Sequence, residues 1–139
     1  MRFLWLVLAV TGPGCPSEPP PACITVQTTC AAAYQPTFNM VYTQTLSKSC
    51  GNDNTSCHSD AGHQAGLTFT DPVISYQQLL DNSSIDPTRK RVVPGDPACS
   101  LLIVRVDSPG KDYQMPKGDP LSPSVRCAMI QWVEMGAMQ

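Results

Sequence analysis

The sequence predicts a small all-α domain of about four short helices, joined by long loops that contain proline and glycine and held together by disulfides. The chain has 139 residues, which is enough for one domain with a modest core. Four segments carry apolar residues at helical spacing behind a helix-start signal, and none alternates over any length as a strand would. Seven cysteines in a chain of this size are typical of a protein that folds in an oxidising compartment.

The first two helices are expected over residues 36–50 and 71–82. In the first, Lys48 near the end suits the negative C-terminal pole of the helix dipole. In the second, Asp71 can cap the helix and Pro72 takes its first position. The apolar faces are expected to contain Phe38, Val41, Tyr42 and Leu46 in the first helix and Val73, Tyr76, Leu79 and Leu80 in the second.

The last two helices are expected over residues 95–106 and 122–137. Asp96 is the expected cap of the third helix and Ser122 that of the fourth, and a proline follows each of them. Gly136 is a stop signal for the fourth helix. The apolar face of this last helix is expected to contain Val125, Ala128, Met129, Trp132 and Val133.

The N-terminus has the pattern of a bacterial export signal. A charged start is followed by the apolar run Phe3–Val10, which is too short to cross a bilayer as a mature helix. The sequence before Cys15 resembles a lipobox, so we expect lipidation of this cysteine, with ordinary signal cleavage as the alternative. Pro16–Pro21 would form a stiff tether to the membrane. The chain is thus expected to be a periplasmic or outer-membrane lipoprotein with a signal peptide (1–14), an anchor, tether and cysteine loop (15–35) and a domain (36–139).

The stretch "SCGNDNTSCHSDAG", Ser49–Gly62, contains a Cys-His pair, Cys57 and His58. Covalent haem attachment normally uses Cys-x-x-Cys-His, but here the preceding cysteine is Cys50 and Asn54 occupies the usual position. Three interpretations stay open. Haem could be held by both cysteines, haem could be held by the second cysteine alone, or the two cysteines could form a disulfide in a haem-free protein.

Several short motifs follow the Cys-His pair in a fixed order. They are "GLTF" (66–69), "RVVPGDPACSLL" (91–102), "YQMPKGDPLS" (113–122) and "IQWVEMGA" (130–137). In this order the motifs resemble those of the small cytochrome c-like domains found in exported proteins of planctomycetes and myxobacteria. The resemblance covers residues 38–137 and implies a cytochrome c-like fold.

The resemblance also implies a set of haem-binding residues. His58 would match the proximal ligand of the iron, Met115 the distal ligand, and Cys57, with Cys50 as a possible second, the covalent anchor. A His/Met pair raises the reduction potential and suits an electron carrier. The implied function is single-electron transfer through haem c to a redox partner protein. The competing interpretation is a haem-free, disulfide-stabilised surface lipoprotein with the same fold and a binding or structural role.

Other types of site are less well supported by the residues. Cys50, Cys57, His58 and His63 are possible zinc ligands, but their spacing lacks the close pairs of structural zinc sites, and we expect His63 in a surface loop. No catalytic residue is assigned, because no enzyme signature is present. The net charge of −2 gives no case for nucleic-acid binding, and we expect the basic run 89–91 to be solvated.

The disulfide pattern is predicted from helix positions. Cys99 and Cys127 each lie in the first turn of an expected helix, and both helices must share one core, so we expect these two to pair. Cys23 and Cys30 are expected to close the N-terminal loop. If Cys15 is lipidated, six cysteines remain, and either three disulfides or two disulfides plus two haem thioethers would use them all.

Overall fold

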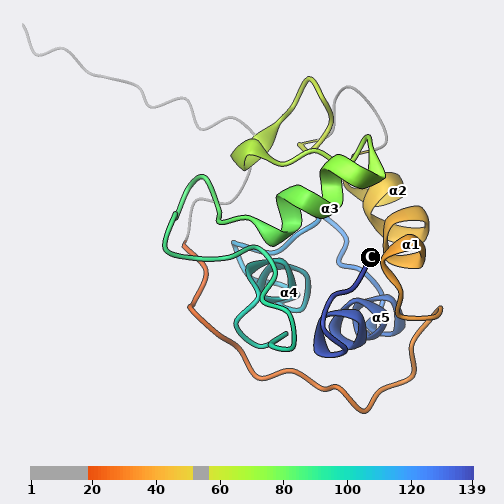
Figure 1. Ribbon diagram of the computed structural model, residues 1–139. Helices are drawn as coiled ribbons and strands as arrows, with labels where there is room; N and C mark the ends of the chain where they lie inside the picture. Colours follow the sequence, from red (N-terminus) through yellow and green to blue (C-terminus); the bar gives the residue numbers. More distant parts are fainter. Residues whose placement is uncertain (1–18, 52–56) are drawn as a thin grey trace, which may run out of the picture.

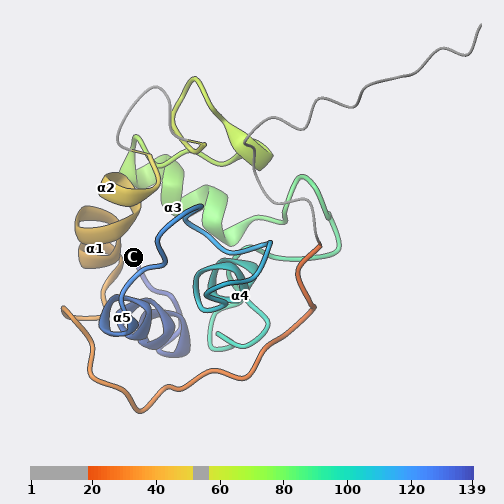
Figure 2. The same ribbon diagram turned by 180° about the vertical axis from the view of Figure 1, so that it is seen from behind.

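The computed structural model describes residues 19–51 and 57–139. The expected signal peptide, the lipidation site Cys15 and the position of Asn54 lie outside these residues. The described residues form helices and loops without a β-strand, and one isolated antiparallel bridge pairs Asn82 with Lys90. Figures 1 and 2 show the helices gathered around a common centre. The expectation of a small all-α fold is therefore confirmed.

The first helical stretch runs from Phe38 to Ser49 in three parts. α1 (Phe38–Val41) passes into a π-helical turn (Tyr42–Leu46) and then into α2 (Ser47–Ser49). The side chains of Phe38, Val41 and Leu46 are buried, as the apolar spacing predicts. This stretch ends at Cys50, so it carries the chain directly to the first of the two cysteines in question.

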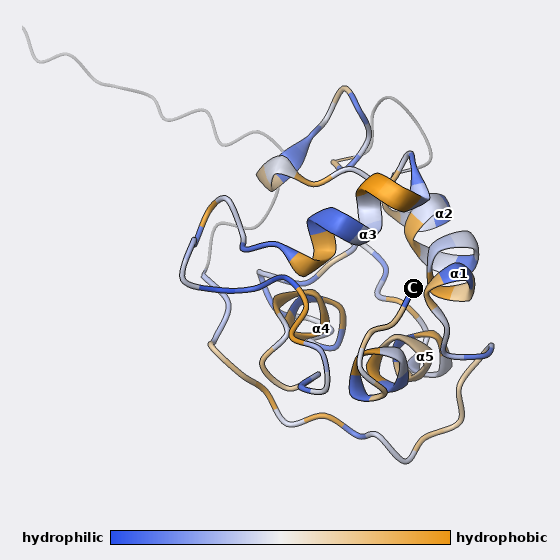
Figure 3. Cartoon of the chain, in the orientation of Figure 1, coloured by the Kyte–Doolittle hydropathy of each residue, from blue (hydrophilic) through white to orange (hydrophobic). Residues whose placement is uncertain are grey.

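α3 (Pro72–Leu80) begins as predicted, because the Asp71 carboxylate accepts a hydrogen bond from Ile74 N at 2.9 Å. The expected apolar face is only partly correct. The residues that the helix buries completely are Ser75 and Leu79, whereas Val73 is 52% exposed. Val73 lies two residues before the buried Ser75. Because each residue turns the helix by about 100°, the two side chains are about 200° apart, so Val73 faces solvent. Figure 3 shows this mixture of hydrophilic and hydrophobic residues along α3.

α4 (Leu101–Val106) starts later than predicted. The Asp96 carboxylate does accept a hydrogen bond from Cys99 N, at 3.1 Å, but it closes only a single turn. Ser100 then has an extended backbone, with a ψ of 118°, and its hydroxyl donates to Asp96 O at 2.7 Å. The Asp-Pro signal therefore begins an isolated turn, and the helix begins behind Ser100.

α5 (Pro123–Glu134) agrees with its signals at both ends. Ser122 Oγ accepts a hydrogen bond from Val125 N at 3.4 Å, and Gly136 adopts a φ of +99° just behind the helix, a conformation that favours glycine. Trp132 is 1% exposed and lies at the centre of the core, with its ring centroid 5.6 Å from that of Phe38. α1 and α4 both pack against α5.

An extended N-terminal segment, residues 19–37, crosses the ends of α4 and α5; we call it the strap (Figure 1). Backbone hydrogen bonds tie it down at both places, from Ile24 N to Ala98 O at 3.0 Å and from Ala33 N to Ser124 O at 2.9 Å. The strap thus forms part of the folded unit.

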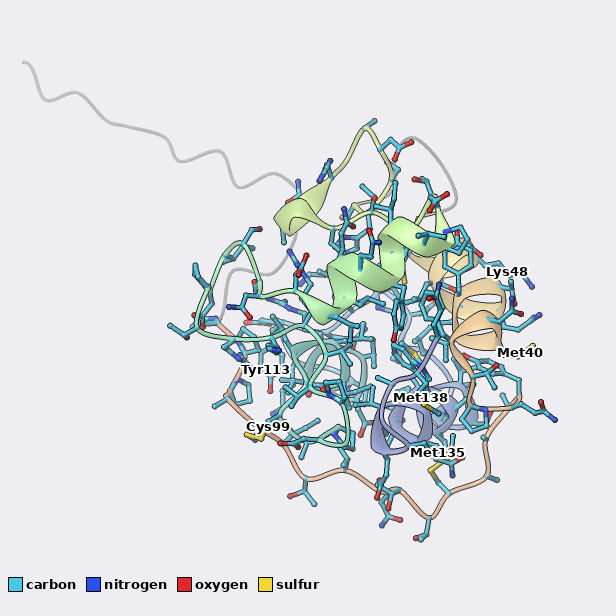
Figure 4. The ribbon with its side chains drawn as sticks, in the orientation of Figure 1. Met40, Lys48, Cys99, Tyr113, Met135 and Met138 are labelled. Atoms are coloured by element: carbon cyan, nitrogen blue, oxygen red, sulfur yellow. A yellow bond between two sulfur atoms is a disulfide. The ribbon has the colours of Figure 1, made fainter. Side chains whose placement is uncertain are left out.

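The disulfide pairings predicted from the sequence are wrong. Cys23 pairs with Cys99 and Cys30 pairs with Cys127, so each helix cysteine bonds to the strap and neither expected pair forms. The reason is the path of the strap, which brings Cys23 to the turn before α4 and Cys30 to α5, so that Cys99 and Cys127 stay separate. Figure 4 shows Cys99 at the edge of the molecule beside the strap.

Candidate cofactor site

A cavity of about 270 Å³ lies between the end of α2, the Cys57–His58 turn, α4 and the loop that follows α4. We call it the His58 cavity. Its walls are mainly apolar, and its volume is close to the lower end of the range for small-molecule sites, about 300 Å³. All four of the residues that the sequence singled out for haem binding line it: Cys50, Cys57, His58 and Met115.

The ring of His58 is oriented by a hydrogen bond from one of its nitrogens. Its Nδ1 lies 3.2 Å from Leu67 O, and since a carbonyl only accepts, Nδ1 carries the proton and donates it. The other nitrogen, Nε2, is then the one with a lone pair for a metal. Burial lowers the pKa of His58, so the ring is neutral at neutral pH, which is the form that binds metals. Phe69 contacts the ring edge-to-face, with centroids 5.4 Å apart.

The turn that carries Cys57 and His58 is fixed by its backbone. Gln64 N donates to Cys57 O at 2.8 Å, and Phe69 N donates to His58 O at 2.9 Å. Both carbonyls next to the candidate ligands are therefore anchored by the segment that follows. His63 is exposed and does not line the cavity, as expected for a loop residue.

The four possible zinc ligands are not all brought together, because His63 does not line the cavity. In residues 19–51 and 57–139, no group of three or more His, Cys, Asp or Glu side chains has an arrangement that could hold a metal ion. The His58 cavity instead offers one imidazole, one thioether and two thiols on apolar walls.

Cys50 has a different setting from Cys57. It ends α2, its N–H donates to Leu46 O at 3.0 Å, and its side chain packs against the hydrophobic core. Burial raises the pKa of its thiol to about 12. A Cβ at the next residue, Gly51, would lie only 2.7 Å from Phe69 Cβ, so no side chain fits at this position. Neither Cys50 nor Cys57 belongs to either disulfide.

Met115 lies in a loop that Gln114 holds in shape. Gln114 is 6% exposed, and its amide accepts from Gly110 N at 2.6 Å and donates to Pro116 O at 3.0 Å and to Gly118 O at 2.9 Å. Met115 N donates to Arg105 O on α4 at 3.0 Å. These bonds fix the backbone on both sides of the methionine. Sequence reasoning missed Gln114, and its only signal was an amide side chain inside a loop rich in glycine and proline.

Three cations border the cavity, Arg91, Arg105 and Lys117, and none of the described Asp or Glu residues lines it. Arg91 is only 7% exposed, and its guanidinium donates to Gln78 O at 2.9 Å and Ala65 O at 2.8 Å. The expectation that the basic run 89–91 is solvated is thus wrong for this residue. Arg91 ties the end of α3 to the turn behind His58.

Comparison with known proteins gives no matching family model, no matching curated protein and no matching solved structure. Within the described part of the chain, no helix is long and apolar enough to cross a membrane.

Proposed function

We propose that the protein is an exported single-electron carrier that holds a c-type haem in the His58 cavity. One observation carries the proposal. Cys57 and His58 share one turn, and Met115 belongs to a loop far along the sequence, yet all three border one mainly apolar cavity. Their side chains are those that a His/Met-ligated, covalently attached haem requires.

The donor groups of the cavity fit this cofactor. His58 Nε2 and the Met115 sulfur would hold the iron, and the Cys57 thiol would form a thioether bond. When bound, the haem supplies the one-electron redox couple. The Leu67 carbonyl orients the imidazole of His58 and makes it a stronger donor. The soft sulfur of Met115 favours ferrous iron, and the apolar walls limit access of water, so both raise the reduction potential.

The order of motifs supports a cytochrome c-like domain as the fold. The Cys-His turn follows the first helical stretch, and the methionine loop precedes the last helix, α5. This is the order in the cytochrome c-like domains that the sequence resembles. The electrons would pass to or from a redox partner protein in the same compartment.

The proposed location is the periplasm or outer membrane of a bacterium, with the domain anchored by a lipid on Cys15. Two disulfides are typical of proteins in an oxidising compartment. Cys15→Ser should release the folded domain from membranes into the soluble fraction, because the strap disulfides hold the domain together without the anchor. Fractionation followed by immunoblotting measures this, and an unchanged membrane fraction would mean that Cys15 carries no lipid anchor.

The proposal is tested by the absorption spectrum of the protein made in a host with cytochrome c maturation machinery. We expect c-type bands and, in the ferric protein, the weak far-red band of methionine ligation. Met115→Ala should remove the far-red band and lower the reduction potential. Met138→Ala is the matched control, since Met138 is 72% exposed and does not line the cavity, and it should leave both unchanged (Figure 4). A colourless protein would overturn the proposal.

The second candidate is a haem-free lipoprotein with a binding or structural role. It is favoured by one observation, that Cys50 and Cys57 border the same cavity and could be oxidised to a third disulfide. In that case the cavity would be available for another ligand. The spectrum described above separates the two candidates.

A further inference from the structure

We propose that Cys57 alone attaches the haem, through a single thioether bond, and that Cys50 remains a thiol in the mature protein. This inference rests on the proposed function and specifies the modification site within it. It follows from the different positions of two cysteines that line the same cavity.

Cys57 is built into the same turn as the candidate ligand. The carbonyl of Cys57 is bonded to Gln64 N, and that of His58 to Phe69 N, so a rigid backbone presents the thiol and the imidazole together. In the sequence motif of c-type haem attachment, a cysteine directly precedes the histidine, as Cys57 precedes His58. Cys57 therefore has the placement that thioether formation needs.

Cys50 is built into the core instead. It closes α2 through the bond from its N–H to Leu46 O, and its partly buried side chain packs against the apolar residues of the core. Gly51, the residue after Cys50, packs so closely against the core residue Phe69 that no side chain fits there, which places the end of α2 against the core. A buried thiol with a raised pKa is also a poor nucleophile, because very little of it is thiolate. Cys50 thus serves as an apolar part of the cavity wall.

The second vinyl group has no other thiol to react with. In Cys-x-x-Cys-His both thiols come from one turn, and the residue three positions before Cys57 is Asn54. The reaction at Cys57 is an addition to one vinyl group of the haem. The sulfur bonds to the vinyl carbon next to the ring, the S–H bond breaks, and its hydrogen goes to the terminal carbon. Nothing leaves, and the addition needs no external oxidant or reductant.

Two measurements on the purified haem protein test the inference. The protein is denatured without a reductant and treated with iodoacetamide, and its alkaline pyridine haemochrome spectrum is recorded. We expect one alkylated residue, Cys50, and an α-band shifted to the red of that of a cytochrome with two thioethers, because one vinyl stays conjugated with the ring. No alkylated cysteine together with the two-thioether band position would overturn the inference.

Matched variants of the two cysteines sharpen the test. Cys50→Ala should keep a haem that resists acid-acetone extraction, with an unchanged α-band position. Cys57→Ala should lose the covalent bond, so that any haem it binds is extracted. Loss of covalent haem in Cys50→Ala, or its retention in Cys57→Ala, would contradict a single bond at Cys57. A wild-type protein without any haem would instead overturn the proposed function, so the two failures are distinguishable.

Discussion

The strap and the His58 cavity use cysteine in opposite ways. Along the strap, disulfides join residues that are 76 and 97 positions apart, and they fasten an extended segment to α4 and α5. At the cavity, Cys50 and Cys57 are seven positions apart and belong to neither disulfide. The disulfides therefore fasten the strap, whereas Cys50 and Cys57 lie at the wall of the cavity. This difference indicates that the disulfides stabilise one side of the fold and that the cysteines of the other side line the candidate site.

The two regions also differ in what holds the chain. The strap contains no helix before Phe38 and relies on its disulfides and on hydrogen bonds, such as those from the Gln131 amide to Thr28 O and Cys30 O at 3.0 Å. The cavity side is held by buried polar side chains, Arg91 and Gln114, that bond to backbone carbonyls. Changes in the strap should therefore affect stability alone, whereas changes around the cavity should affect the cofactor as well.

The largest expected effect is that of His58→Ala on haem content. Without the imidazole the proposed haem would lose an iron ligand, so incorporation should fall to background while the strap disulfides still form. His63→Ala is the matched control, because this histidine is exposed and outside the cavity, and it should keep the wild-type haem content. The haem-to-protein ratio from absorbance measures both. Equal haem content in the two variants would contradict the role of His58.

The next largest effect concerns the strap. Replacing both Cys30 and Cys127 by alanine opens a large loop, which should lower the free energy of unfolding by about 4 kcal/mol. Cys50→Ala, by contrast, removes one buried sulfur and should cost about 1 kcal/mol. Urea unfolding followed by circular dichroism measures both values. If the double variant lost less free energy of unfolding than Cys50→Ala, the strap would not be the stabilising region.

A smaller effect is expected for Gln114→Leu at the cavity, and Gln131→Leu at the strap is its matched comparison. Gln114→Leu leaves Gly110 N and the carbonyls of Pro116 and Gly118 without their partner, which should cost about 1 to 3 kcal/mol. The loosened loop should also weaken or remove the far-red methionine band, while the thioether bond stays. Gln131→Leu makes the same chemical change at the strap and should leave the band intact. Identical spectra for the two variants would show that Gln114 does not position Met115.

The sequence predicts those parts of the fold that depend on local chemistry. Asp71 and Ser122 cap their helices and Gly136 ends the last one, because a cap needs only the neighbouring backbone. The start of α4 was predicted wrongly, since the Ser100 hydroxyl competes for the backbone and confines the Asp96 signal to one turn. The disulfide pairs could not be derived either, because they depend on where the extended strap runs.

The candidate site, too, could be predicted from short motifs but not where it depends on the fold. The Cys-His and Met-Pro motifs identify Cys57, His58 and Met115 from the sequence, and the structure places all three on one cavity. Gln114 and Arg91 could not be found in this way. Their roles lie in hydrogen bonds to carbonyls from turns and helix ends that come together only in the fold.

The most direct test of the account is the intact mass of the mature protein, made in a host with cytochrome c maturation machinery and washed with acid-acetone. We expect the mass of the processed chain plus one haem, because a thioether at Cys57 survives this extraction. A colourless protein with the mass of the chain alone, and with Cys50 and Cys57 in one disulfide-linked peptide, would contradict the claim that the His58 cavity holds a haem.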